Sequence, residues 1–143
     1  MASQVTEIRS TFGIMSSVIN FFRVSPKRSR ALETAIQALL PGCGKGAIPN
    51  LSDTRWVERH SACISFYKLY VAITAALEEL SVGGSDSTAT EATTLLAAVS
   101  RSTFVVSLVI LRHVLNITKQ LALRLQLVQQ DLNECVKEVS PLK

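Results

Sequence analysis

The apolar residues in the last third of the chain recur every three or four positions, which is the spacing of one face of an α-helix. This phase holds almost to Pro141, with a pause at residues 100–102. The apolar set comprises Phe104, Leu108, Leu111, Leu115, Ala122, Leu125, Leu132 and Val136. A helix of about 35 residues would be roughly 50 Å long, which exceeds the width of a compact domain of this size. We therefore expect part of this helix to project, or to pack on something outside the chain.

The first 40 residues predict a helical hairpin. A single helical stripe runs through Val5, Ile8, Phe12, Met15, Ile19 and Phe22, and we expect this helix to stop near Val24. Ser25 is a suitable N-cap and Pro26 a suitable first residue for a second helix, which continues to about Leu40.

The remaining segments predict further helices separated by two loops. Residues 41–52 are rich in Gly and Pro and predict a loop, residues 53–80 predict a third helix with a broad apolar face, and 81–88 predict a second loop. Thr88 and Glu91 have the spacing of a capping box, so we expect a long helical segment over 89–139 to begin there. Since no segment alternates apolar and polar residues for long, the expected fold class is all-α, with four to five helices in a single domain, 1–143.

Composition limits the class of protein. The 143 residues are 48% hydrophobic and 18% charged, which argues against a disordered tail. The three cysteines are far apart and the N-terminus has no apolar signal core, so we expect a reduced, intracellular chain. The most apolar run, Phe104 to Leu111, is followed by Arg112 and His113, so we expect no membrane span and no membrane partner.

The net charge of +4 arises in the N-terminal part of the chain. Residues 1–60 hold eight Lys and Arg against four acids, and the remainder balances seven against seven. Arg23, Lys27, Arg28 and Arg30 surround Ser25 and could contact phosphates. The alternative is a solvated helix start, because cations are common on exposed helices and a charge of this size is ordinary for a soluble domain.

Arg55 and Trp56 form a second candidate site for nucleic acid. Trp56 is the one tryptophan in the chain, and it lies beside a guanidinium where a loop is expected to enter a helix. An indole can stack on an unpaired base while an arginine holds the adjacent phosphate. The alternative is that Trp56 is a core residue of the third helix.

The chain lacks the motifs of common catalytic and metal sites. No phosphate loop or nucleophile elbow occurs. His60 and Cys63 share a helical face and could supply half of a zinc site, but no second close ligand pair accompanies them. The carboxylates Asp53, Glu58, Glu78 and Glu79 do not form a pattern for Mg²⁺. His113 has no Ser or Cys that the sequence can nominate as its partner. We expect no enzyme activity, no metal, no cofactor and no small-molecule substrate.

Several segments together resemble the insertion region of hAT-superfamily transposases and their domesticated relatives, such as the zinc-finger MYM-type proteins. The central segment is Leu51–His60, with the sequence LSDTRWVERH, followed by FYKLY at 66–70 and ALEEL at 76–80. The flanking segments 21–28 and 111–132 are also similar to that family. The resemblance thus covers nearly the whole chain.

The resemblance implies a helical insertion without the catalytic core of the family. In that family an RNase H-like domain carries an acidic triad, whose Asp residues would lie before Met1 and whose Glu would lie beyond Lys143. The family's zinc finger and dimerisation segment have no counterpart here. Arg55 and Trp56 match the Arg-Trp motif, whose Trp is associated with a flipped base at the transposon end, and the missing triad puts that role in doubt.

The sequence and this resemblance together predict a non-catalytic fragment of a domesticated hAT-type transposase. It would be a nuclear, helical scaffold that contacts nucleic acid or protein. The expected partners are DNA, bound weakly and without sequence specificity, and a second copy of the chain or another helical protein. One alternative is an autonomous helical protein–protein interaction module without nucleic-acid affinity, and another is a degenerate gene fragment with no function.

Overall fold

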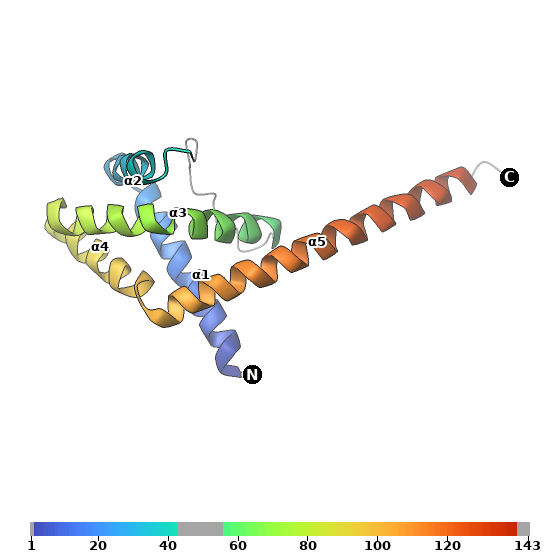
Figure 1. Ribbon diagram of the computed structural model, residues 1–143, viewed down its shortest axis with the longest axis horizontal. Coiled ribbons are helices and arrows are strands. Elements are labelled where there is room, and N and C mark those ends of the chain that lie inside the picture. The colour runs from blue at the N-terminus through green and yellow to red at the C-terminus, as the bar shows by residue number, and fades with distance from the viewer. Residues whose placement is uncertain (1, 43–55, 140–143) are drawn as a thin grey trace. The chain divides into compact units, whose positions relative to one another are not determined.

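A computed structural model describes residues 2–42 and 56–139, with the side chains of 6–42 and 60–120. These residues form five α-helices and no strand, which confirms the predicted all-α class (Figure 1). Internal contacts divide the chain into two units, Met1–Arg112 and His113–Lys143. Residues 43–52 of the first predicted loop, and the predicted helix start at residue 53, lie outside the described residues.

The first two helices are α1, Ala2–Arg23, and α2, Pro26–Leu39. Ser25 separates them in an extended conformation, and Pro26 is the first residue of α2, where its missing N–H has no cost. Ser25 is the N-cap residue, as predicted, although its side chain makes no capping hydrogen bond; its backbone carbonyl accepts the first helical hydrogen bond, from Ser29 N–H. The buried face of α1 consists of Thr11, Met15, Val18, Ile19, Phe21 and Phe22.

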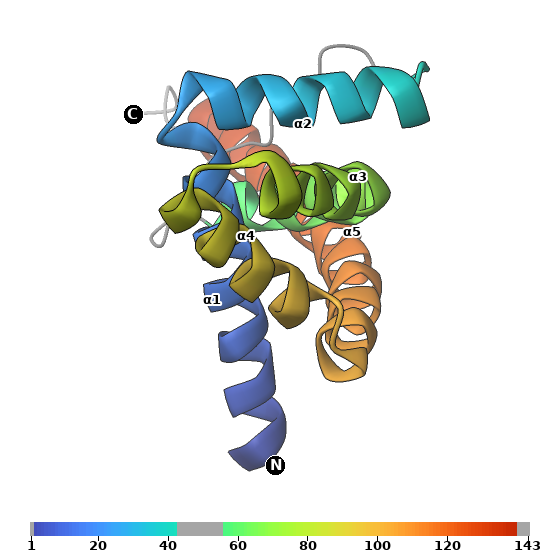
Figure 2. The same cartoon turned by 90° about the vertical axis from the view of Figure 1, so that its left-hand side faces the viewer.

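The helix α3, Trp56–Gly83, lies at the centre of the first unit. It packs against α2 on one side and against α4, Asp86–Val99, on the other, while α1 packs against α2 and α4 (Figures 1 and 2). Because α3 has neighbours on several sides, its apolar residues are not confined to one stripe. Its fully buried side chains are Ala62, Cys63, Phe66, Ala72, Ile73, Ala76 and Leu77.

The start of α4 differs from the sequence prediction. The helix begins at Asp86 with Ser85 at the N-cap position, so the capping box predicted at Thr88 and Glu91 is wrong. Thr88 lies inside the first turn of α4, where its hydroxyl accepts from Ser85 Oγ and from Arg28 Nη2. The sequence has the capping-box spacing, but the side chains of Thr88 and Glu91 contact Arg28 of α2.

The helix α5, Ser102–Val139, follows a short break at Ser100 and Arg101. Its first turns belong to the first unit, in which Phe104, Leu108 and Leu111 are buried. The ring of Phe104 meets Phe66 of α3 edge to face, with centroids 6.0 Å apart. At the end of this stretch, the Arg112 guanidinium lies 4.2 Å from the centroid of the Tyr67 ring. These contacts attach the beginning of α5 to α3.

Candidate functional site

The predicted phosphate contact Arg28 is engaged inside the protein. Its guanidinium lies 3.1 Å from the Glu91 carboxylate, donates to Thr88 Oγ1 at 3.1 Å and to the Phe21 carbonyl at 3.4 Å, and stacks 4.1 Å from the Phe21 ring centroid. The side chain is only 16% exposed. Arg28 therefore connects α2 to both α1 and α4, and a contact with phosphate would compete with these interactions.

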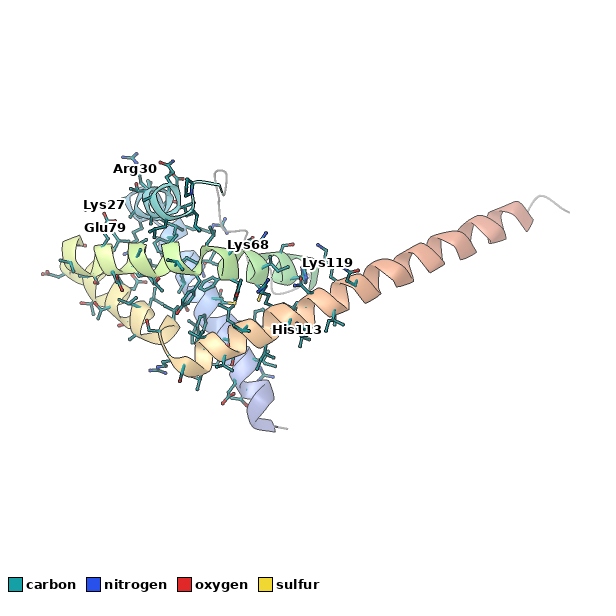
Figure 3. The ribbon with its side chains drawn as sticks, viewed as in Figure 1. Lys27, Arg30, Lys68, Glu79, His113 and Lys119 are labelled. Atoms are coloured by element: carbon teal, nitrogen blue, oxygen red, sulfur yellow. The ribbon has the colours of Figure 1, made fainter. Side chains whose placement is uncertain are left out.

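The other three cations of this cluster are exposed. Arg23 is the last residue of α1, and Lys27 and Arg30 lie three positions apart on α2. Figure 3 shows Lys27 and Arg30 on α2, with Glu79 on the neighbouring helix α3. The structure thus leaves Arg23, Lys27 and Arg30 accessible to an anionic partner, close to acids such as Glu33 that are also exposed.

The Arg-Trp pair falls at the edge of the described residues. Arg55 lies outside them, and Trp56 is the first residue of α3, where only its backbone is described. Both interpretations of Trp56, base stacking and core packing, stay predictions.

The residues considered for metal binding lie in different surroundings. His60 and Cys63 are buried on α3, and burial raises the pKa of the Cys63 thiol from 9.0 to about 11. The thiol therefore keeps its proton to a higher pH than an exposed cysteine does. Glu78 and Glu79 are exposed on α3, whereas Asp53 lies outside the described residues and the Glu58 side chain is not described. Among the described side chains, those of 6–42 and 60–120, no three His, Cys, Asp or Glu come together as a metal site would require.

An apolar groove, which the sequence pattern alone does not predict, lies between α1 and the first turns of α5. Its volume is about 390 Å³, and it is open to solvent. The groove is lined by Glu7, Ile8, Ser102, Thr103, Val106, Ser107 and Ile110. Val106 and Ile110 are 56% and 52% exposed, although they are large apolar side chains in the middle of a helix.

A second apolar series in the sequence of α5 indicates this groove. Besides the stripe that contains Phe104 and Leu108, α5 has a second apolar series at helical spacing that begins with Val106 and Ile110. Periodicity identifies both series but not which one faces the core. The structure shows that the first is buried and that the second is largely exposed.

The segment Ser102–Gln120 of α5 is long and apolar enough to cross a membrane when judged by length and composition alone. Core helices of water-soluble proteins pass the same test, so a single such segment is weak evidence. Phe104, Leu108 and Leu111 of this segment are buried in the protein.

Comparison of the chain with models of protein families, with curated proteins and with solved structures finds no match. The similarity to the hAT insertion region therefore stays a prediction that rests on the sequence segments given above.

Proposed function

We propose that this chain is a non-enzymatic helical scaffold that binds another protein in the groove between α1 and α5. The observation that carries the proposal is the exposure of Ile8, Val106 and Ile110 around one open groove. Exposed apolar side chains that cluster on a surface mark interaction sites, whereas scattered ones need no explanation.

The mixture of apolar and polar side chains that line the groove favours an amphipathic helix as the bound element. A partner helix of this kind inserts apolar side chains at positions i, i+3 or i+4, and i+7. The hydroxyls of Ser102, Thr103 and Ser107 can bond to polar groups at its border. Glu7 lines the same groove, so we expect a Lys or Arg on the partner helix near that position.

We also propose an origin for the scaffold in the insertion region of an hAT-type transposase, which would place it in the nucleus. This proposal is supported by the order of the segments at 21–28, 51–60, 66–70 and 111–132, and an all-α fold is compatible with it. The proposed origin does not change our expectation that the groove between α1 and α5 binds a helix of another protein.

The groove is tested with two matched substitutions in the full chain. Val106 and Val71 are 56% and 58% exposed within helices, but only Val106 lines the groove. The unmodified chain is crosslinked to its partners in cells, and the captured proteins are identified. We expect Val106→Lys to lose these partners, since a lysine would bring a charge into the apolar contact. Val71→Lys should capture the same partners as the unmodified chain. Identical partner sets for the two variants would contradict the proposal.

Weak, non-specific binding of nucleic acid is a second candidate function, which the exposure of Arg23, Lys27 and Arg30 favours. Affinity would come from phosphate contacts and would fall steeply with salt, with dissociation constants of about 10⁻⁴ to 10⁻⁶ M. Arg55 and Trp56 would add a preference for unpaired bases if the stacking interpretation holds.

Oligonucleotide binding at several salt concentrations tests this candidate. Lys27→Gln and Lys68→Gln each remove one exposed cation, from α2 and α3 respectively (Figure 3). We expect Lys27→Gln to reduce the slope of log affinity against log salt by about one and Lys68→Gln to leave it unchanged. Equal effects of the two substitutions would mean that the α2 cluster has no special role.

A further inference from the structure

The second unit of the chain, His113–Lys143, is helical up to Val139 and has no other secondary structure among its described residues. An isolated helix gains little stability in water without a surface on which its apolar face can pack. The sequence of this helix nevertheless contains a continuous apolar series. Its spacings are 3-4-4-3-4-4-3, and its members are Val114, Ile117, Leu121, Leu125, Val128, Leu132, Val136 and Val139.

This series defines one stripe along the helix, which we term the C-terminal stripe. Spacings of three and four keep its positions on one face over the whole length. Its first two members, Val114 and Ile117, are 47% and 57% exposed. A stripe of this length without a polar position is the pattern of a helix that pairs with another helix.

The charges of the same helix are distributed unevenly. Lys119 and Arg124 lie in its first half, whereas Asp131, Glu134 and Glu138 lie in its second half together with Lys137. The first half thus has no acid, and the second half has more acids than bases. A second copy lying antiparallel would bring the basic half of each helix against the acidic half of the other, while a parallel copy would bring like charges together.

The position of Arg124 on the helix distinguishes an antiparallel pair from a parallel one. Arg124, Asp131 and Glu138 are seven residues apart and so share one flank of the C-terminal stripe, whereas the other flank has the uncharged Ala122 and Gln129. In an antiparallel pair the same flanks of the two helices face each other, and in a parallel pair opposite flanks do. Only the antiparallel arrangement therefore brings charged flank to charged flank.

We propose that two copies of this chain form an antiparallel dimer through their C-terminal stripes. If Val114 lies opposite Val139 at each end, Arg124 lies next to Asp131 of the partner subunit. The two-fold symmetry repeats this contact, so each dimer has two such ion pairs. A pattern that is complementary to itself favours a second copy over an unrelated partner. The proposal does not depend on the groove between α1 and α5.

Sedimentation equilibrium of the full chain tests the dimer. We expect a dimer for the unmodified protein and, for Leu125→Lys, a dissociation constant raised at least about tenfold, because each lysine would lie in the apolar seam opposite Val128 of the partner subunit. Leu123→Lys is the matched control, since position 123 lies about half a turn away from the C-terminal stripe. It should leave the dissociation constant unchanged.

Charge exchange tests the orientation. Arg124→Asp and Asp131→Arg should each raise the dissociation constant, by about tenfold, because each turns two attractive pairs into repulsive ones. The double variant should restore the original value in an antiparallel dimer. A strictly monomeric protein at high concentration, a dimer insensitive to Leu125→Lys, or a double variant as weak as the single ones would each overturn the proposal. Loss of the dimer by Val106→Lys alone would assign self-association to the groove instead, and would also overturn it.

Discussion

At the scale of single residues, Arg28 shows how a charge pattern can have a structural cause. The sequence groups it with Arg23, Lys27 and Arg30 as a candidate contact for phosphate. In the structure its guanidinium bonds to the Phe21 carbonyl, to Thr88 and to Glu91. Both of the α4 partners lie 60 or more positions away in the sequence, so no local pattern could have revealed them. One of four apparently equivalent cations is therefore part of the packing.

Replacing Arg28 should destabilise the protein more than replacing its neighbour. We expect Arg28→Ala to lower the free energy of unfolding by about 1–2 kcal/mol, from two lost hydrogen bonds and the stacking on Phe21. The ion pair itself contributes little, because the Glu91 side chain is 52% exposed. Lys27→Ala, on the same turn but exposed, should change stability by less than about 0.5 kcal/mol. Urea denaturation measures both, and equal losses would refute the structural role of Arg28.

Cys63 should make stability depend on pH at the alkaline end. Burial raises its pKa from 9.0 to about 11, so between these values the folded state retains a proton that the unfolded state has lost. The contribution of Cys63 to stability is therefore fully present below pH 9 and is lost as the pH rises towards 11. The difference in unfolding free energy between the unmodified chain and Cys63→Ala should shrink over that range. A constant difference from pH 8 to pH 11 would show that the thiol is not protected by burial.

At the scale of helices, the break between α3 and α4 depends on a close approach of the backbone at Gly84. A Cβ at this position would lie 2.5 Å from the Leu80 carbonyl oxygen and 3.2 Å from the Ala89 amide nitrogen. At the preceding residue, Gly83, a Cβ would have no neighbour within 4 Å. Two adjacent glycines that look alike in the sequence thus have different roles.

Alanine at each of these glycines should give opposite results. Gly84→Ala should lower the free energy of unfolding by about 1–3 kcal/mol, because the backbone of Leu80 or Ala89 must shift. Gly83→Ala should leave the free energy of unfolding unchanged or raise it by up to about 1 kcal/mol. Gly83 is the last residue of α3, and alanine has a higher helix propensity than glycine. Thermal unfolding of both variants provides the measurement. A Gly84→Ala variant as stable as Gly83→Ala would mean that this turn tolerates a side chain.

Helical periodicity was sufficient to predict the all-α class, but not the contacts that organise the helices. Ser25 and Pro26 mark the junction of α1 and α2 because proline restricts the chain locally. Thr88 and Glu91 misled the prediction because a capping pattern and a tertiary contact with Arg28 use the same polar side chains. The groove was missed for a related reason: the two apolar series of α5 are equivalent in the sequence, and tertiary packing, such as that of Phe104 on Phe66, determines which one is buried.

At the scale of the whole molecule, the two units differ in how their helices gain stability. In residues 1–112 each helix packs on others, and α3 has a largely apolar surface buried by its neighbours. Residues 113–139 continue as a helix whose sequence contains the C-terminal stripe. If that stripe is covered by a second copy, the stability of this segment must depend on protein concentration, while that of the first unit need not.

Amide hydrogen exchange should reveal this difference. Well above the dimer dissociation constant, amides of residues 113–139 should be protected, and on dilution well below it they should exchange nearly as fast as in an unfolded chain, because a lone helix frays. Amides of α3 between residues 62 and 80 should stay protected at both concentrations, since their packing lies within one chain. Leu125→Lys should cause fast exchange of 113–139 at the higher concentration as well. Protection of 113–139 that is independent of concentration and unaffected by Leu125→Lys would mean that this helix is stabilised without a second copy.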